Sequence, residues 1–247
     1  MNDIHKRPSR RQGKVSKTES GGGQRLPTDV RAAGILAAAR EVIDEKGYES
    51  VLISDIAKRA GVVDGTIYRY FKNKRDLLEQ VAQRWFGEQL AMDSQLNAVK
   101  GTRNKLRHLA WRTLAIIRRE PVLARFMLME LRHDPRYRST PFFEMNKRFT
   151  QDVIAVCTEA VVSGEFLSDV SPNMLRDMLH GCIEHRTWAF LQGEGDFDIE
   201  EVADGIATVI YRGMLAKREL AQGGLYEAVK RIESVAGKLE DLMVGKS

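Results

Sequence analysis

Hydroxyl-bearing and cationic side chains gather in a short stretch of the chain, between Ser54 and Lys74. Thr66 offers a hydroxyl and a methyl group, while Tyr68 and Tyr70 each end in a phenol that can donate to a phosphate oxygen. Lys74 adds a cation at the start of a helix, where phosphate is already favoured. A Tyr-X-Tyr-Phe run followed by Lys-Asn-Lys is a poor core sequence, so the pattern favours contact with a nucleic-acid backbone.

Short helices must position these side chains, and the spacing of apolar residues predicts them. A first helix begins near Thr28 and ends at Gly47, which can adopt the left-handed conformation that stops a helix. A second runs over residues 54–60, and Gly61 ends it before a third begins near Asp64. Two short helices across a tight glycine turn, packed on a longer first helix, predict a helix-turn-helix.

The same stretch resembles the tetracycline-repressor (TetR) family of bacterial regulators over roughly residues 30–80. The matching runs are Asp55-Ile56-Ala57, Ala60-Gly61-Val62, Gly65-Thr66-Ile67-Tyr68-Arg69-Tyr70-Phe71, and Asn73-Lys74 leading into Leu77-Leu78. The side-chain chemistry and the resemblance together assign the DNA contacts to Ser54, Asp64, Gly65, Thr66, Tyr68, Arg69, Tyr70 and Lys74.

Three positions depart from the family pattern. A Thr is usual where Leu52 stands and touches phosphate, so that contact is lost here unless Ser54 substitutes for it. A Ser that caps the third helix is usual where Val63 stands, and Asp64 is the candidate cap in its place. The negative charge of Asp64 would repel phosphate or select a cytosine amino group, so the operator cannot be read from the resemblance.

Positive charge is concentrated at the N-terminal end of the chain. The net charge of the 247 residues is +5, of which +5 lies in residues 1–27, +2 in residues 28–75 and −2 in residues 76–247. These ranges are the predicted units: a disordered basic arm, a DNA-binding head and a helical body for ligand binding and dimerisation. The arm is either a solubilising tail or a source of extra phosphate or minor-groove contacts, and both interpretations stay open.

The rest of the chain shows helical periodicity, including segments at 173–191, 199–216 and 225–242, and no long alternating pattern. The predicted fold class is all-α, a three-helix head joined to a larger helical body. No apolar run reaches the about 18 residues that a membrane span needs, so no membrane partner is expected. Only Cys157 and Cys182 are present, which fits a reducing cytoplasm.

In the family that the chain resembles, the body binds a small ligand and forms a homodimer through its last two long helices. Aromatic and methionine side chains suit an apolar, adaptable pocket, although such residues at helical spacing are more often plain core. The candidate pocket residues are Trp111, Phe126, Met127, Phe142, Phe143, Phe149 and Trp188. The candidate interface residues, for which packing inside one subunit competes, are Met178, Cys182, Ile206, Ile210 and Met214.

The stretch from His180 to Trp188 is loosely similar to a ligand-domain helix of fatty-acid-responsive members, which suggests an acyl-CoA or another long apolar effector. Cys182 and His185 lie three apart but lack a further spaced ligand set, so no metal is predicted. No nucleophile elbow is present, so no catalytic residue and no cofactor are predicted. An enzyme with a vestigial head is therefore the least favoured hypothesis.

The favoured hypothesis is a homodimeric repressor that binds a palindromic double-stranded DNA operator and is released by a small, apolar effector. The alternative is a DNA-binding regulator of the same family that has no small-molecule effector. The presence or absence of a ligand-sized cavity in the body separates the two.

Deletion of residues 1–27 is expected to flatten the salt dependence of DNA affinity, because seven cations leave and fewer counterions are released on binding. The slope of log affinity against log salt concentration measures this for the full chain and the truncated chain. Equal slopes would make the arm a tail without DNA contacts.

Overall fold

A computed structural model describes residues 28–91, 96–216 and 229–233 of the chain. The predicted arm at 1–27, and most of the helix predicted over 225–242, lie outside the described residues. Within the described residues the chain forms helices and one isolated antiparallel bridge between Phe166 and Leu215, with no strand. The predicted all-α fold is confirmed.

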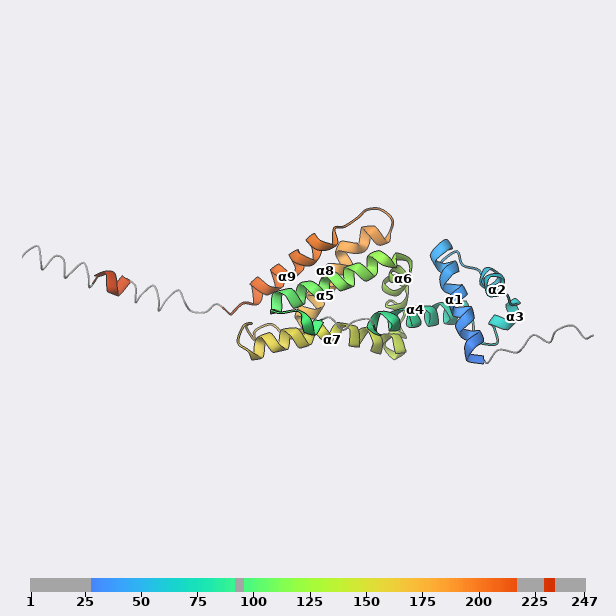
Figure 1. Ribbon diagram of the computed structural model, residues 1–247, viewed down its shortest axis with the longest axis horizontal. Helices are drawn as coiled ribbons and strands as arrows, with labels where there is room; N and C mark the ends of the chain where they lie inside the picture. Colours follow the sequence, from blue (N-terminus) through green and yellow to red (C-terminus); the bar gives the residue numbers. More distant parts are fainter. Residues whose placement is uncertain (1–27, 92–95, 217–228, 234–247) are drawn as a thin grey trace, which may run out of the picture.

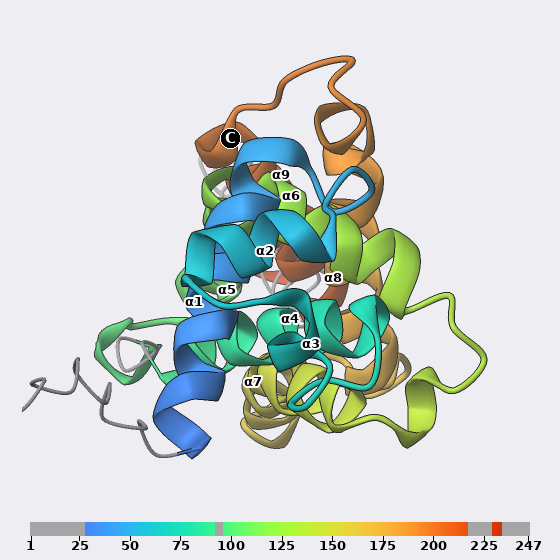
Figure 2. The same cartoon turned by 90° about the vertical axis from the view of Figure 1, so that its right-hand side faces the viewer.

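The head is built from α1 (Thr28–Lys46), α2 (Ile53–Ala60) and α3 (Asp64–Ile67), which lie nearest the viewer in Figure 2. Gly47 and Gly61 have φ angles of +76° and +65°, a region that L side chains rarely adopt. These glycines end α1 and α2, as the sequence predicts, and let the chain turn sharply into the next element.

The long helix α4 (Lys74–Ala91) runs from the head into the body (Figure 1). The hydroxyl of Ser171 accepts a hydrogen bond from the backbone N–H of Met174 at 3.2 Å and caps α8 (Pro172–Leu191), which begins with a proline in its first turn. The remaining elements are η1 (Leu96–Ala98), α5 (Thr102–Arg119), α6 (Pro121–Arg125), η2 (Phe126–Leu131), η3 (Tyr137–Ser139), α7 (Pro141–Val162), α8 (Pro172–Leu191) and α9 (Ile199–Met214).

The segment after Pro121 changes its helix type. Pro121 occupies the first turn of α6, and after five residues α6 passes into η2, a π-helix. A π-helical segment is wider than an α-helix and is frequently found at functional sites. Here it brings Met127 and Leu128 to a cavity wall.

The buried apolar side chains form two separate clusters. The head core joins α1 to α4 and extends to η2 and the start of α7; it includes Ile35, Ile56, Ile67, Leu77, Trp85, Phe86, Met127 and Phe149. The body core joins α5, α8 and α9 with the rest of α7; it includes Leu109, Leu114, Ala124, Val156, Leu179, Ile183 and Ile206.

None of the helices in the described ranges is both long enough and apolar enough to cross a lipid bilayer. Over the same ranges, no group of three or more histidine, cysteine or acidic side chains is arranged to hold a metal ion.

Truncation of Leu109 to Ala is expected to lower the free energy of unfolding by about 2–5 kcal/mol, because the side chain is 1% exposed at the centre of the body core. The matched control is Val162→Ala, which removes an 83% exposed side chain and should change stability by less than about 0.5 kcal/mol. Urea unfolding followed by circular dichroism measures both; equal losses would contradict this assignment of the core.

Candidate DNA-binding head and ligand cavity

The start of α2 lacks a side-chain cap. Leu52 occupies the N-cap position, and its side chain has no acceptor for the helix N–H groups. Instead, the carboxylate of Asp55 accepts a hydrogen bond from the backbone N–H of Leu52 at 3.4 Å and pairs with Lys46 at 2.8 Å. Ser54 is the second residue of α2 and is exposed, so it does not occupy the cap position, and a phosphate contact from its hydroxyl remains a prediction.

The start of α3 also differs from expectation. Val63 is the N-cap, with no side-chain hydrogen bond, and Asp64 is the first helical residue. The prediction that Asp64 caps α3 is therefore wrong, because the helix begins one residue earlier than a cap at Asp64 requires. Asp64 and Gly65 are exposed, and Thr66 is partly buried.

The two tyrosines of this segment lie in different environments. Tyr68 is 54% exposed and follows directly after α3, next to the exposed Arg69. Tyr70 packs against the head core, with its ring centroid 6.5 Å from that of Phe71. Tyr68 is thus better placed than Tyr70 to reach a phosphate, and DNA contact by both remains a prediction.

Lys74 links the start of α4 to the loop between α1 and α2. Its ammonium donates to the backbone carbonyl oxygen of Glu49 at 3.2 Å. This contact holds the ammonium end of the side chain next to the head. A phosphate contact from its other ammonium protons remains a prediction.

A side-chain cap at the start of α4, similar to a capping box, was not predicted from the sequence. The side chain of Asn73 accepts from the backbone N–H of Asp76 at 2.9 Å, and the carboxylate of Asp76 accepts from the backbone N–H of Lys72 at 2.8 Å. An Asn followed three residues later by an acidic side chain is the sequence signal that indicates this arrangement. The box fixes the angle at which the chain leaves the head for the body.

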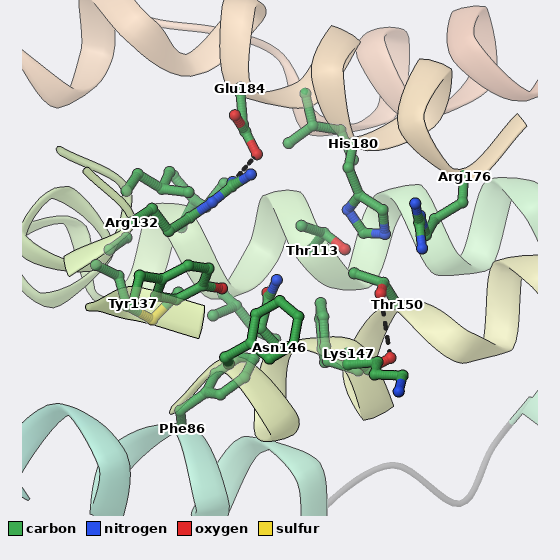
Figure 3. A pocket seen from close by; sticks show the side chains of 18 of the residues that line it. Phe86, Thr113, Arg132, Tyr137, Asn146, Lys147, Thr150, Arg176, His180 and Glu184 are labelled. Carbon is green, nitrogen blue, oxygen red and sulfur yellow. Dashed lines mark hydrogen bonds and ion pairs between the residues drawn. The ribbon is translucent and has the colours of Figure 1, made fainter. Parts of the chain in front are cut away.

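A cavity of about 500 Å³ lies in the body among α4, α5, η2, α7 and α8 (Figure 3). Ligand pockets in proteins commonly measure about 300–1,000 Å³, so the cavity has the size of a ligand site. Residues of the head core form part of its wall, among them Trp85, Phe86, Met127 and Phe149. Residues of the body core form another part, namely Ile117, Ala124 and Ile183. The cavity therefore separates the two cores.

Three of the predicted pocket residues, Met127, Phe143 and Phe149, line this cavity. The other four do not. Phe126 is buried in the head core, and Phe142 packs there against Phe86 at 5.3 Å between ring centroids. Trp111 is 38% exposed and donates through Nε1 to Glu200 at 2.7 Å, while Trp188 is 54% exposed on α8. These four residues have the expected side-chain type, but their side chains point elsewhere.

The pocket prediction from the sequence considered only aromatic and methionine side chains, and so it did not include the polar and charged residues that line the cavity. Arg176, His180 and Glu184 recur every four residues on one face of α8, a spacing that is visible in the sequence. Figure 3 shows them on the cavity wall, with Glu184 paired to Arg132 across from α8. The other missed polar wall residues include Thr113, Tyr137, Arg138, Asn146, Lys147, Thr150 and Asp177.

The imidazole of His180 is held neutral. Burial, followed by the positive charges of Arg112, Arg132 and Arg176, lowers the pKa of His180 to about 4. Its ring stacks near Phe149, with 6.3 Å between centroids. At neutral pH this side chain therefore offers one donor and one acceptor but no charge.

The predicted interface residues divide between the surface and the interior. Met178 and Cys182 are exposed on α8, next to the exposed Trp188. The assignment of Ile206, Ile210 and Met214 to an interface is wrong, because all three are buried in the body core of their own chain. The apolar face of α9 that carries these three residues packs against α5. Val209, which is 67% exposed, lies on the outer face of α9.

These features define a helix-turn-helix DNA-binding protein whose helical body contains a ligand-sized cavity. A model of the bacterial regulatory proteins of the tetR family matches residues 35–81, and a model of the tetracyclin repressor-like C-terminal domain matches residues 100–214. The two matches cover most of the head and the body, and the chain belongs to the TetR family of transcriptional regulators.

Relatives of the chain regulate fatty acid metabolism. The fatty acid metabolism regulator protein of Bacillus subtilis is 28% identical over 73% of this chain and 93% of that protein. The transcriptional activator FasR of Mycolicibacterium smegmatis is 35% identical over 43% of this chain and 45% of that protein. The structure of FadR from Bacillus subtilis in complex with stearoyl-CoA is similar with a TM-score of 0.62 and 27% identity, over 74% of this chain and 98% of that one.

Replacement of Tyr68 by Phe is expected to weaken DNA binding about fivefold, because one hydrogen bond to the backbone is lost while the ring stays. Fluorescence anisotropy with a duplex from upstream of the protein's own gene measures the dissociation constant. The matched control is Tyr211→Phe, which removes a phenol that donates to Glu165 at 2.9 Å in the body. Unchanged affinity of the Tyr68→Phe chain would exclude this contact.

Proposed function

We propose that this chain is a homodimeric transcriptional repressor that leaves its palindromic operator when a long-chain acyl-CoA binds in the body cavity. The observation that carries the proposal is the composition of the cavity wall, which is apolar in depth and cationic at its edge. The alternative, a family member without an effector, does not account for a cavity of about 500 Å³ between two otherwise buried cores.

The charge of the wall fits a phosphate-bearing ligand. Four cations, Arg132, Arg138, Lys147 and Arg176, line the cavity together with two carboxylates. Arg138 and Lys147 are exposed, so they lie where a ligand enters from solvent. Cations at a pocket entrance attract phosphate groups, and the apolar residues behind them, such as Phe149, suit an acyl chain.

Comparison with relatives supports the same ligand class. The similar FadR structure from Bacillus subtilis holds stearoyl-CoA, and the related full-length protein is named for fatty acid metabolism. We extend this ligand class to the present chain. The role we assign is one of binding rather than catalysis, in the cytoplasm where DNA and acyl-CoA are both available.

A homodimer would form through the outer faces of α8 and α9. Large apolar side chains are exposed there, including Met178, Trp188 and Val209, which are 45%, 54% and 67% exposed. Exposed apolar groups gathered on neighbouring helices mark an interaction surface, and a four-helix arrangement of two such pairs would cover them.

Ligand binding would act on DNA through the two cores. Because the cavity separates the head core from the body core, a ligand that fills it contacts both and favours one relative position of the two. The heads of a dimer must be spaced to match the operator half-sites, so a change in head position lowers operator affinity.

Stearoyl-CoA is expected to release the protein from DNA, and Lys147→Glu should raise the concentration needed about tenfold, because a phosphate contact becomes repulsive. The control is Arg148→Glu, the same charge change at the neighbouring exposed residue, which does not line the cavity. Anisotropy titrations with labelled duplex measure release. No release of the wild-type chain by any acyl-CoA would exclude the proposed effector.

A further inference from the structure

Two polar side chains that line the cavity end in buried atoms that have no hydrogen-bond partner, namely Trp85 at Nε1 and His180 at Nε2. A third, Tyr137, lines the cavity with its phenol next to the side chain of Asn146. Native proteins pair nearly all buried polar atoms. These three groups, from α4, α8 and η3 around one cavity, indicate that the apolar part of the ligand carries a polar group.

The chemistry of the three atoms narrows that group. The indole N–H of Trp85 can only donate, the phenol of Tyr137 can donate, and His180 donates from Nε2 in one of its neutral tautomers. A group that all three can serve must accept hydrogen bonds. An oxygen acceptor within an acyl ligand is its carbonyl oxygen.

Two hydroxyl groups of the cavity wall are already engaged. The hydroxyl of Thr113 donates to the carbonyl of Leu109 at 2.9 Å, and that of Thr150 donates to the carbonyl of Lys147 at 3.1 Å. Figure 3 shows His180 reaching from α8 between Thr113 and Arg176, with Tyr137 on the other side of Asn146 in this view. His180 is thus the neutral donor that α8 supplies to the ligand, whereas Arg176 is charged and pairs with Asp177.

We propose that His180 recognises the acyl carbonyl oxygen of the effector inside the cavity, with Tyr137 as a second donor. The inference rests on the proposed function, since it assumes an acyl ligand in this cavity. It adds that the protein distinguishes an acyl group from a plain alkyl chain of the same length. The neutral ring, whose protonation the nearby guanidinium groups oppose, suits an uncharged oxygen.

The test compares stearoyl-CoA with S-octadecyl-CoA, a thioether in which CH₂ replaces the carbonyl. Isothermal titration calorimetry of the full chain is expected to show about tenfold tighter binding of the thioester, the effect of one buried hydrogen bond. His180→Phe should bind both probes about equally, at the weaker affinity. His180→Gln, which keeps a donor, should restore part of the preference.

Two further variants separate recognition from misfolding. Tyr137→Phe keeps the ring, which packs edge-on against Phe143 at 5.5 Å, and removes only the hydroxyl, so it should reduce the preference about threefold. His133→Phe makes the same change as His180→Phe at an exposed residue that does not line the cavity, and should leave the preference intact.

The outcomes are distinct. Equal binding of both CoA probes by the wild-type chain, or an undiminished preference in His180→Phe, overturns the inference and leaves the acyl-CoA effector standing. Binding of stearate in place of stearoyl-CoA overturns the inference, because a carboxylate is a charged acceptor and not the uncharged carbonyl oxygen, and it replaces the proposed acyl-CoA by a free fatty acid. If neither CoA probe nor stearate binds, both the inference and the proposed function fall.

Discussion

The hydrophobic interior of this chain is divided, and the cavity between its two parts is the constraint on which the rest of the structure depends. The head core packs α1 to α4 together and reaches into η2 and the start of α7, whereas the body core holds α5, α8 and α9. The continuous helix α7 contributes to both, with Phe149 in the head core and Val153 in the body core. The cavity is therefore the place where one bound ligand would contact residues of both cores.

Ion pairs connect the elements around that cavity. Arg132 and Glu184 form an ion pair that joins the segment after η2 to α8, and Arg75 pairs with Asp134 at 2.7 Å, which joins the start of α4 to the body. Tyr137 lies three residues after Asp134 and lines the cavity. The loop that carries Asp134 and Tyr137 thus contacts the first turn of α4 at one residue and lines the cavity at another. A ligand that contacts Tyr137 therefore lies near the point where α4 leaves the head.

The sequence predicted the head in detail because its signals are local. Glycines with positive φ, apolar residues at helical spacing and the run from Thr66 to Lys74 each depend on neighbours a few residues away. The error at Asp64 is also local, because it placed the cap of α3 one residue too far along the chain. A cap is defined by where the chain enters the helix, and the sequence does not fix that entry to one residue.

By itself the sequence determined the family, the all-α class and, within the described residues, the helix boundaries to within a few residues. It also showed that the body is rich in the aromatic and methionine side chains that suit a pocket. The tertiary structure decided which of those side chains face the cavity, the core or solvent. Neighbours such as Phe142 and Phe143 in α7 point about 100° apart on the helix, and periodicity identifies an apolar face without saying what covers it. On α9, Ile206 lies in the body core and Val209 faces solvent. The packing of α5 against α9 decides which of these two faces is buried.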